Sequence, residues 1–459
     1  MHSSERQNGI FIAKVIHLLF SVAVFYLCWL MFRYDTVNPE KLYDFRYNYF
    51  IAAGYTVVLY LFTRTYNAYL LGFSRIRGLA FSQFISQFFT ISIIYIAVSV
   101  GWWKINSPIW FIPLLIIQGL FDCIWSFVAS ALYFKVNPPK KALLIYRNET
   151  DKKRFGSVAG KPVGRIYEVV DELQYDGYRF KDIKDKLEGF EAIFVAGINS
   201  RCRNGISKYC VENNIPGFFL PHVGDVLMRG AKHIQTFTSP VLFFGKKVPK
   251  PEYLMLKRLF DIIAAGLGII VFSPLMLITA LAIRLYDRGP ALYKQVRLTK
   301  DSKEFKILKF RSMRVDAEKD GVARLSTGDK DDRITPIGKI VRKCRLDELP
   351  QLFNILKGDM SIVGPRPERP EIAEQYYRVL PDFKLRLQVK AGLTGYAQVY
   401  GKYNTEPYEK LEFDLMYIND MSIATDLRLI FATFSILGKS DSTEGVSGIT
   451  AMGEEEEEK

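Results

Sequence analysis

Four apolar runs, each long enough to cross a bilayer, constrain the fold of this chain more than any other feature. They lie at residues 9–32, 48–72, 79–103 and 108–134. A helix needs about 20 mainly apolar residues to span the hydrocarbon core of a membrane. The second run is the weakest because Arg64 interrupts it, and Lys14 and His17 interrupt the first. Buried helices of a soluble protein are the alternative, but the length and aromatic ends of the runs favour a four-span bundle over residues 1–138.

The loops between these runs predict how the bundle is oriented. The loop around Arg64, Arg75 and Arg77 has no acidic residue, and a group of lysines follows the fourth run. The positive-inside rule then places both ends of the bundle in the cytoplasm. The net charge of +14 suits an anionic membrane surface, phosphorylated substrates or nucleic acid.

Residues 139–250 read as a soluble α/β segment. Residues 141–146 and 191–197 have the composition of buried strands, and 217–221 and 241–245 are further candidates, with helical patterns between them. We expect a small parallel, Rossmann-like sheet. The first strand lacks the glycine fingerprint that cradles a dinucleotide phosphate. The segment is therefore predicted to bind no cofactor and to be structural, oligomerising or regulatory.

A fifth apolar stretch, residues 257–289, carries Ser273-Pro274 at its centre. A straight spanning helix with a proline kink is one interpretation. However, both flanks are basic, which indicates that both ends prefer the cytoplasmic face. A re-entrant helix at 257–287 that breaks at Ser273-Pro274 satisfies this preference, and Ser273 is positioned to bond a carbonyl freed by the break.

The vicinal carboxylates Asp347 and Glu348 are the centre of the predicted chemistry. They lie between a basic run and the sequence Gly364-Pro365-Arg366-Pro367. Pro350 fits the first turn of a helix, so Asp347 is predicted as the N-cap of a helix that ends at Gly358. Such an N-terminus favours phosphate nearby, and arginines around Asp347 should keep it ionised, as a nucleophile or metal ligand requires. A capped helix with solvated salt bridges explains the same residues equally well.

Two basic side chains precede this stretch in a predicted strand at 303–313. Lys309 and Arg311 fall on one face of the strand, and we expect them to help form a site for a diphosphate donor. All histidines precede residue 251, so chemistry in the C-terminal half would run without imidazole. The cysteines have neither metal-ligand spacing nor the pattern of a disulfide framework. Residues 408–438 predict helices, the last lying on the membrane, and the acidic tail at 439–459 is predicted to be disordered.

Several motifs occur in a specific order across residues 251–438. They are KRLFD with the later Ser273-Pro274, ILKFRSM, LDELPQLFNILKGDMSIVGPRPE and AGLTGYAQV. In this order they resemble the polyprenyl-phosphate hexose-1-phosphate transferases, the bacterial sugar transferases among the monotopic phosphoglycosyl transferases. With the four spans and the α/β segment, the chain is similar to the large form of that family. The expected architecture is a four-span membrane bundle, a soluble Rossmann-like α/β segment, and an α/β-containing monotopic catalytic domain with a re-entrant helix.

The resemblance implies a two-step reaction. Asp347 would attack the β-phosphorus of a UDP-sugar and release UMP, and undecaprenyl phosphate would then accept the sugar phosphate from the aspartate. Glu348 would position Mg²⁺ with Asp347, or deprotonate the lipid phosphate, and the metal would offset diphosphate charge. Lys309, Arg342 and Arg366 match positions at which the family places phosphate-binding cations, and Glu368 is a further candidate for the same site.

The resemblance also implies partners and a location. We expect a multi-pass protein of the bacterial inner membrane with a cytoplasmic catalytic domain and no nucleic-acid partner, and the sequence leaves open whether it forms a homodimer. Departures from the family pattern at Lys390, Tyr396 and Tyr400 leave the donor sugar open, with glucose or galactose favoured for the large form.

Two other functions stay open at this point. A glycosyltransferase would move only the sugar and release UDP, and it usually needs an Asp-x-Asp metal site. Asp329-Lys330-Asp331 is the one such sequence, in a polar loop. A non-enzymatic membrane scaffold of polysaccharide assembly would fit the N-terminal half alone, but it does not explain Asp347 and Glu348.

Overall fold

The structure is a computed structural model, and its chain divides into two compact units, residues 1–220 and 221–459. The described residues are 3–36, 45–101, 103, 107–159, 163–235, 240–243, 245–246, 249–315, 317, 331–401 and 406–436. The acidic tail predicted at 439–459 lies outside them.

Four helices form the first part of the N-terminal unit. They are α1 (Ser3–Thr36), α2 (Phe45–Thr65), α3 (Ile76–Gly101) and α4 (Phe111–Val136). Their core is aromatic and aliphatic, because Phe25 and Tyr55 stack with ring centroids 3.9 Å apart and share a cluster with Leu59 and Leu114. α1, α3 and α4 are long and apolar enough to cross a membrane, whereas the described part of α2 is not among the candidate spans. The four predicted helices are therefore present, and the second is again the weakest span.

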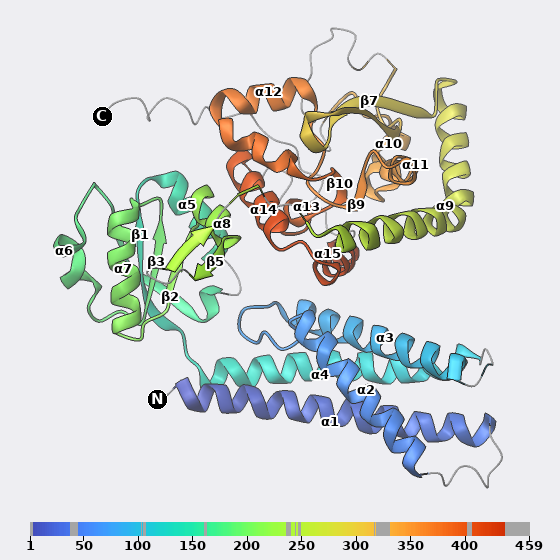
Figure 1. Ribbon diagram of the computed structural model, residues 1–459, viewed down its shortest axis with the longest axis horizontal. Helices are drawn as coiled ribbons and strands as arrows, with labels where there is room; N and C mark the ends of the chain where they lie inside the picture. Colours follow the sequence, from blue (N-terminus) through green and yellow to red (C-terminus); the bar gives the residue numbers. More distant parts are fainter. Residues whose placement is uncertain are drawn as a thin grey trace. The chain divides into compact units, whose positions relative to one another are not determined.

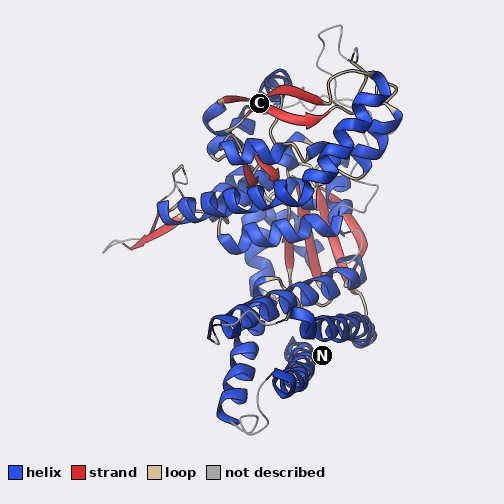
Figure 2. Cartoon of the chain, turned by 90° about the vertical axis from the view of Figure 1, so that its right-hand side faces the viewer, coloured by secondary structure: helices blue, strands red, loops and turns tan. Residues whose placement is uncertain are grey.

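A parallel sheet completes the N-terminal unit (Figures 1 and 2). In spatial order its strands are β2 (Tyr167–Gln174), β1 (Lys140–Tyr146), β3 (Ala192–Ala196) and β4 (Gly217–Phe219). α7 (Ser200–Glu212) shares one core with the sheet through Ile206, and α5 (Glu149–Ala159) shares another through Phe155. The strands expected at 141–146 and 191–197 are confirmed, as is the parallel pairing, and β2 was not predicted.

The strand expected at 241–245 does not join that sheet. It is β6 (Pro240–Phe243), which pairs antiparallel with β5 (Lys232–Gln235) in the C-terminal unit, after helix α8 (Val223–Arg229). Strands joined by a short connection pair antiparallel, because a parallel pair needs a crossover of about a dozen residues or more.

The apolar stretch after residue 250 forms one long helix, α9 (Pro251–Asp287), with Pro274 inside it. Figure 1 shows α9 as two arms that meet at a bend. Proline has no N–H, so Pro274 leaves the carbonyl of Ile270 without its usual helical donor. The hydroxyl of Ser273 donates to that carbonyl at 2.8 Å. The predicted bond from Ser273 to a freed carbonyl is therefore confirmed.

Both arms of α9 pack on the same globular domain. Ala265 of the first arm shares a core with Ile355 of α11 (Gln351–Lys357). Ile283 of the second arm shares a core with Phe310 and with Val341 of α10 (Pro336–Lys343). The two ends of α9 therefore belong to the core of one domain.

The rest of the domain consists of short elements. They are an antiparallel pair, β7 (Leu292–Leu298) with β8 (Glu304–Phe310), a parallel pair, β9 (Ser361–Val363) with β10 (Gly392–Thr394), and helices α12 (Pro370–Val379), α13 (Tyr396–Tyr400), α14 (Pro407–Asn419) and α15 (Ile423–Ile436). Gly364 and Gly392 cross so closely that a Cβ atom on either would lie 2.4 Å or less from backbone of the other segment. This crossing brings the loop that follows β9 against β10. The strand predicted at 303–313 and the helices predicted at 408–438 are confirmed, with tighter bounds.

Candidate active site

Asp347 and Glu348 lie in a tight turn between two helices. Thr335 caps α10 by accepting the Gly338 N–H at 3.0 Å, and the helix ends at Cys344. Arg345 then takes a left-handed conformation with φ of 56°, which turns the chain into a single 3-10 turn over Leu346–Glu348. A residue with a side chain pays roughly 1–2 kcal/mol for this conformation. Backbone strain of this kind is typical of functional sites.

The predicted N-cap at Asp347 is wrong. α11 begins at Gln351 with Pro350 in the capping position, and it ends, as predicted, at Gly358 in a left-handed conformation. The backbone between Arg345 and Phe353 is held by bonds to the third preceding residue, such as Leu352 N–H to Leu349 C=O at 3.1 Å. This tighter winding separates Asp347 from the start of α11, so its carboxylate is available for other contacts.

Glu348 is the carboxylate that the surrounding cations contact. Its Oε1 lies 3.0 Å from Arg366, 3.6 Å from Lys309 and 3.9 Å from Arg345. Burial alone would raise the pKa of Glu348, but these three cations outweigh it and lower the pKa to about 2. Glu348 is thus ionised throughout the physiological range.

Asp347 lies half-buried beside this cluster. Its Oδ1 has no hydrogen-bond partner among the described residues. Burial and the charge of Glu348 raise the pKa of Asp347 to about 6, against the opposing effect of Lys309, Arg342 and Arg345. A carboxylate with this pKa is mostly ionised at pH 7 and yet poorly solvated, which is the state that a nucleophile needs. The structure therefore brings together Asp347, Glu348, Lys309, Arg342 and Arg366.

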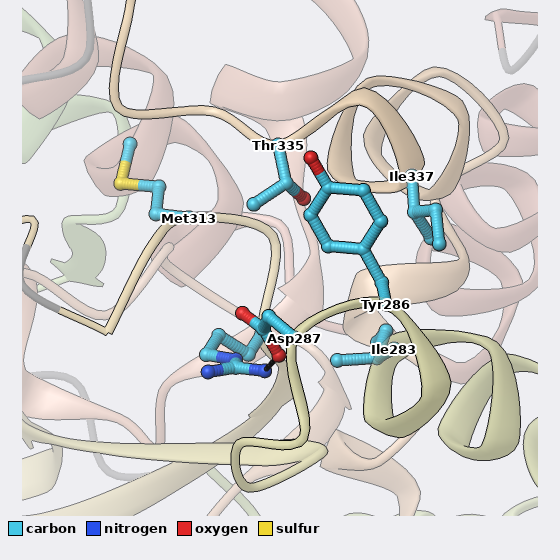
Figure 3. Close-up of a pocket in the computed structure, with 7 residues that line it drawn as sticks. Ile283, Tyr286, Asp287, Met313, Thr335 and Ile337 are labelled. Carbon is cyan, nitrogen blue, oxygen red and sulfur yellow. Dashed lines mark hydrogen bonds and ion pairs between the residues drawn. The ribbon is translucent and has the colours of Figure 1, made fainter.

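Arg311 does not join this group, although Lys309 does. β8 ends at Phe310, and beyond it the Arg311 side chain turns to an ion pair with Asp287 at the end of α9. The pair lies at a small pocket (Figure 3), which is lined by Ile283, Tyr286, Asp287, Arg311, Met313, Thr335 and Ile337. The expectation of both cations at one diphosphate site is corrected, because the strand alternation on which it depended stops one residue too early.

Glu368 lies in a second cluster behind the loop that carries Arg366. Its Oε1 is 3.7 Å from Arg386 and 3.9 Å from Lys410. Burial would raise its pKa, but Lys410, Arg386, Arg297 and Arg366 lower it overall. Glu368 therefore supports the loop rather than facing Asp347.

The sequence did not indicate Arg386, the arginine whose hydrogen bonds hold this loop. Arg386 is 3% exposed and donates from Nε and Nη2 to Oδ2 of Asp414, each at 2.7 Å. Its Nη2 also donates to the backbone carbonyl of Arg366 at 2.8 Å. Arg297 donates to the carbonyl of the next residue, Pro367, at 3.3 Å, and its burial lowers its pKa to about 10. The buried Arg386 and the half-buried Arg297 thus hold the two backbone carbonyls that directly follow the Arg366 side chain.

The first arm of α9 holds α11 and β9 through polar contacts. Arg258 donates to the last carbonyls of α11, those of Ile355 and Leu356, at 2.6 and 2.7 Å. Asp261 accepts the N–H of Ile362 in β9 at 3.0 Å. These bonds satisfy backbone groups that the ends of a helix and a short strand otherwise leave free.

The residues that depart from the family pattern lie in β10 and its flanks. Lys390 donates to the carbonyl of Gly358 at 2.8 Å and so caps the end of α11. Tyr396 and Tyr400 contact each other with ring centroids 5.4 Å apart. Of the Asp-x-Asp sequence, Asp331 is described and pairs with Arg333 at 2.7 Å, and the other two residues lie outside the described part.

The donor atoms present fit a hard divalent cation. No group of three or more histidine, cysteine or acidic side chains converges among the described residues. Magnesium, however, is usually bound by one or two carboxylates, with water and substrate phosphates completing its shell. Asp347, whose Oδ1 has no hydrogen-bond partner among the described residues, and the neighbouring Glu348 supply such a pair of carboxylates.

Comparisons with known proteins agree with these motifs. The family model described as bacterial sugar transferase matches residues 252–440. The Exopolysaccharide production protein PSS of Rhizobium leguminosarum is 40% identical over 189 residues, which are 39% of this chain and 94% of that protein.

Two longer relatives match over part of their length. One is the UDP-N-acetylgalactosamine-undecaprenyl-phosphate N-acetylgalactosaminephosphotransferase of Aeromonas hydrophila, 38% identical over 49% of this chain and 52% of its own. The other is the UDP-glucose:undecaprenyl-phosphate glucose-1-phosphate transferase of Klebsiella pneumoniae, 43% identical over 39% of each chain. The chain thus spans about half of these relatives or less.

Proposed function

Because the chain belongs to the bacterial sugar transferase family, we propose that it transfers a hexose 1-phosphate from a UDP-sugar to undecaprenyl phosphate. This transfer would begin the synthesis of a polysaccharide repeat unit. One observation carries the proposal: Asp347, a half-buried aspartate whose Oδ1 has no hydrogen-bond partner among the described residues, lies beside a glutamate that contacts the cations of the site. The names of the relatives support the acceptor, and they include glucose and N-acetylgalactosamine donors.

The first step is an in-line displacement at phosphorus. A carboxylate oxygen of Asp347 attacks the β-phosphorus, and the bond from that phosphorus to the oxygen bridging the two phosphates breaks. UMP leaves with the bridging oxygen and its electron pair, and a sugar-phosphoryl aspartate remains. Lys309, Arg342 and Arg366 stabilise the negative charge that spreads over the phosphoryl oxygens.

The second step regenerates the enzyme. An oxygen of undecaprenyl phosphate attacks the same phosphorus, and the bond between phosphorus and the Asp347 oxygen breaks. The products are the free carboxylate and a lipid diphosphate sugar. Glu348 has a pKa of about 2 and is therefore a poor base, so its role is to hold Arg366, Lys309 and Arg345 in place. Mg²⁺ held by Asp347 and Glu348 would supply charge neutralisation for the donor diphosphate.

The membrane arrangement follows from α9. Both arms pack on one domain, and Ser273 satisfies the carbonyl that Pro274 frees, so we propose that α9 enters and leaves the bilayer on the same face. The catalytic domain would then lie on the cytoplasmic side of the inner membrane, where UDP-sugars are made. The active site would face the headgroup layer, where the phosphate of the acceptor lies.

The nucleotide product tests the proposal. Membranes containing the protein would be mixed with undecaprenyl phosphate, Mg²⁺ and a panel of UDP-sugars, and the released nucleotide would be identified. UMP release that disappears in Asp347→Asn supports the two-step reaction, and the active donor names the sugar. Release of UDP would mean that only the sugar moves, and full activity of Asp347→Asn would refute the covalent step.

A further inference from the structure

A polar cluster lies inside the helical bundle of the N-terminal unit, and none of its residues takes part in the chemistry above. His17 and Ser21 come from α1, Gln87 from α3, and Gln118 and Asp122 from α4, and each has 0% exposure. A carboxylate among membrane-spanning helices is costly to bury, and such groups mark functional sites. The cluster therefore needs a chemical explanation.

The N–H and O–H donors of Gln87, Gln118 and Ser21 are already used. Gln87 Nε2 lies 3.0 Å from Asp122 Oδ1 and 3.2 Å from Ser21 Oγ. Gln118 Nε2 lies 3.0 Å from the carbonyl of Ser21 and 2.9 Å from the hydroxyl of Tyr55. The Ser21 hydroxyl donates to the carbonyl of His17 at 2.9 Å. Both amide groups and the serine thus have no N–H or O–H left to give.

Three side-chain oxygens of the same cluster accept no hydrogen bond. They are Asp122 Oδ2, Gln87 Oε1 and Gln118 Oε1, all buried and without a hydrogen-bond partner among the described residues. Turning an amide over does not remove the excess. In Gln87 it would set an oxygen against Asp122 Oδ1, and in Gln118 against the Ser21 carbonyl. The surplus of acceptors is therefore built into the bundle.

The net charge of the cluster depends on where the protons of His17 lie. His17 Nε2 lies 2.9 Å from Asp122 Oδ1, and His17 Nδ1 lies 2.9 Å from the Tyr69 hydroxyl. With the tyrosine donating to Nδ1, the imidazole is neutral and gives its single N–H to the carboxylate. The carboxylate charge is then not balanced by any cationic side chain of the cluster.

We infer that the bundle binds one hard monovalent cation, of the Na⁺ type, at the side-chain oxygens of Asp122, Gln87 and Gln118. Hard cations take oxygen ligands and require no donor in return. A water molecule donates at most two hydrogen bonds and carries no charge, so it would leave one of the three oxygens without a partner and the carboxylate charge unbalanced. A single carboxylate balances one positive charge, which excludes a divalent ion on electrostatic grounds. Because the ligands come from α3 and α4, and Ser21 of α1 bonds both glutamines, the ion would stabilise the packing of these three helices.

The tryptophans of this chain provide a selective probe. Every one of them lies in the first 138 residues, so tryptophan fluorescence reports the unfolding of the bundle alone. The experiment heats the purified full-length protein in detergent with NaCl, KCl or choline chloride at equal ionic strength. We expect the bundle midpoint to rise with the logarithm of the Na⁺ concentration relative to choline, as ligand linkage requires. ²³Na relaxation on the same sample should show saturable binding.

Three variants separate an ion site from general stability. Asp122→Asn and, as a second variant that keeps the hydrogen bond between His17 and Asp122, Gln118→Leu should both lose the Na⁺-dependent rise. Gln83→Leu is the matched control, because this buried glutamine of α3 has its oxygen satisfied by Ser126 at 3.1 Å, and it should keep the rise whatever its own midpoint. Equal midpoints of the unaltered protein in Na⁺, K⁺ and choline, with no saturable ²³Na binding, would overturn the inference and leave water as the occupant.

Discussion

Replacing Arg386 by methionine should loosen the whole support of the Arg366 loop. Methionine keeps much of the length and apolar stem of arginine but removes every N–H. The change therefore deletes two bonds to Asp414 at 2.7 Å and one to the carbonyl of Arg366 at 2.8 Å. It also leaves Asp414, which is 1% exposed, without its cation.

The size of the effect follows from the charge of Asp414, which stays buried without its cation. Breaking a buried ion pair by removing one partner costs about 3–5 kcal/mol, because the other charge stays buried and uncompensated. Since about 1.4 kcal/mol corresponds to a factor of ten, local opening of this region should become roughly 10²-fold more frequent or greater. The double variant Arg386→Met with Asp414→Leu should lose less stability than the single variant, because it leaves no buried carboxylate without a cation.

Hydrogen–deuterium exchange of the purified protein measures this opening directly. Peptides from α14 and from residues 381–388 should exchange faster in Arg386→Met, and UMP release should fall as the Arg366 loop loses its position. Arg378→Met, at an exposed position of α12, is the control and should match the unaltered protein. Exchange that is unchanged in Arg386→Met, or a double variant whose loss is the sum of the two single losses, would refute the reasoning.

Three further outcomes are expected. Ser273→Ala should destabilise α9 by about 1 kcal/mol, because the carbonyl that Pro274 frees then has no donor, and the thermal midpoint of the purified protein in lipid nanodiscs checks this. Glu368→Gln should lower the midpoint at pH 7, and the difference from the unaltered protein should shrink as the pH falls below about 4.3, the ordinary pKa of a glutamate. The pKa of Glu368 is depressed in the folded state, so its contribution is present above the unfolded pKa and is lost as pH falls through the folded one; exposed Glu371→Gln should show no such pH dependence. Chelation of Mg²⁺ should abolish UMP release, and added Mg²⁺ should restore it, whereas retained activity in excess chelator would exclude Asp347 as a ligand of an essential metal.

The elements that the sequence predicted well are those set by local physics. Apolar length predicted the helices of the bundle and α9, and the missing N–H of Pro274 predicted the bond that Ser273 makes. Gly358 ends α11 because a left-handed residue is needed there. In each case the deciding interaction lies within a few residues along the chain.

The predictions that failed depend on contacts between distant segments. Arg311 leaves the expected cation site because Asp287, which lies 24 residues earlier, draws it to the end of α9. Arg386 and Asp414 are 28 residues apart, and no local pattern marks either of them as part of the support of Arg366. The tight turn around Asp347 was missed for a local reason: it follows from the left-handed conformation of Arg345, which the residue type does not indicate.

The contacts of α9 have a practical consequence for anyone who wants a water-soluble version of the catalytic domain. Lys257, Asp261 and Ala265 are buried in that domain, and Arg258 closes the end of α11. α9 is thus an integral part of the folded catalytic domain and not merely a membrane anchor. Removing α9 would expose the interior of the domain to water and leave the α11 carbonyls without their donor. A water-soluble version would therefore keep the α9 side chains that pack on the domain and replace the exposed apolar ones with polar residues.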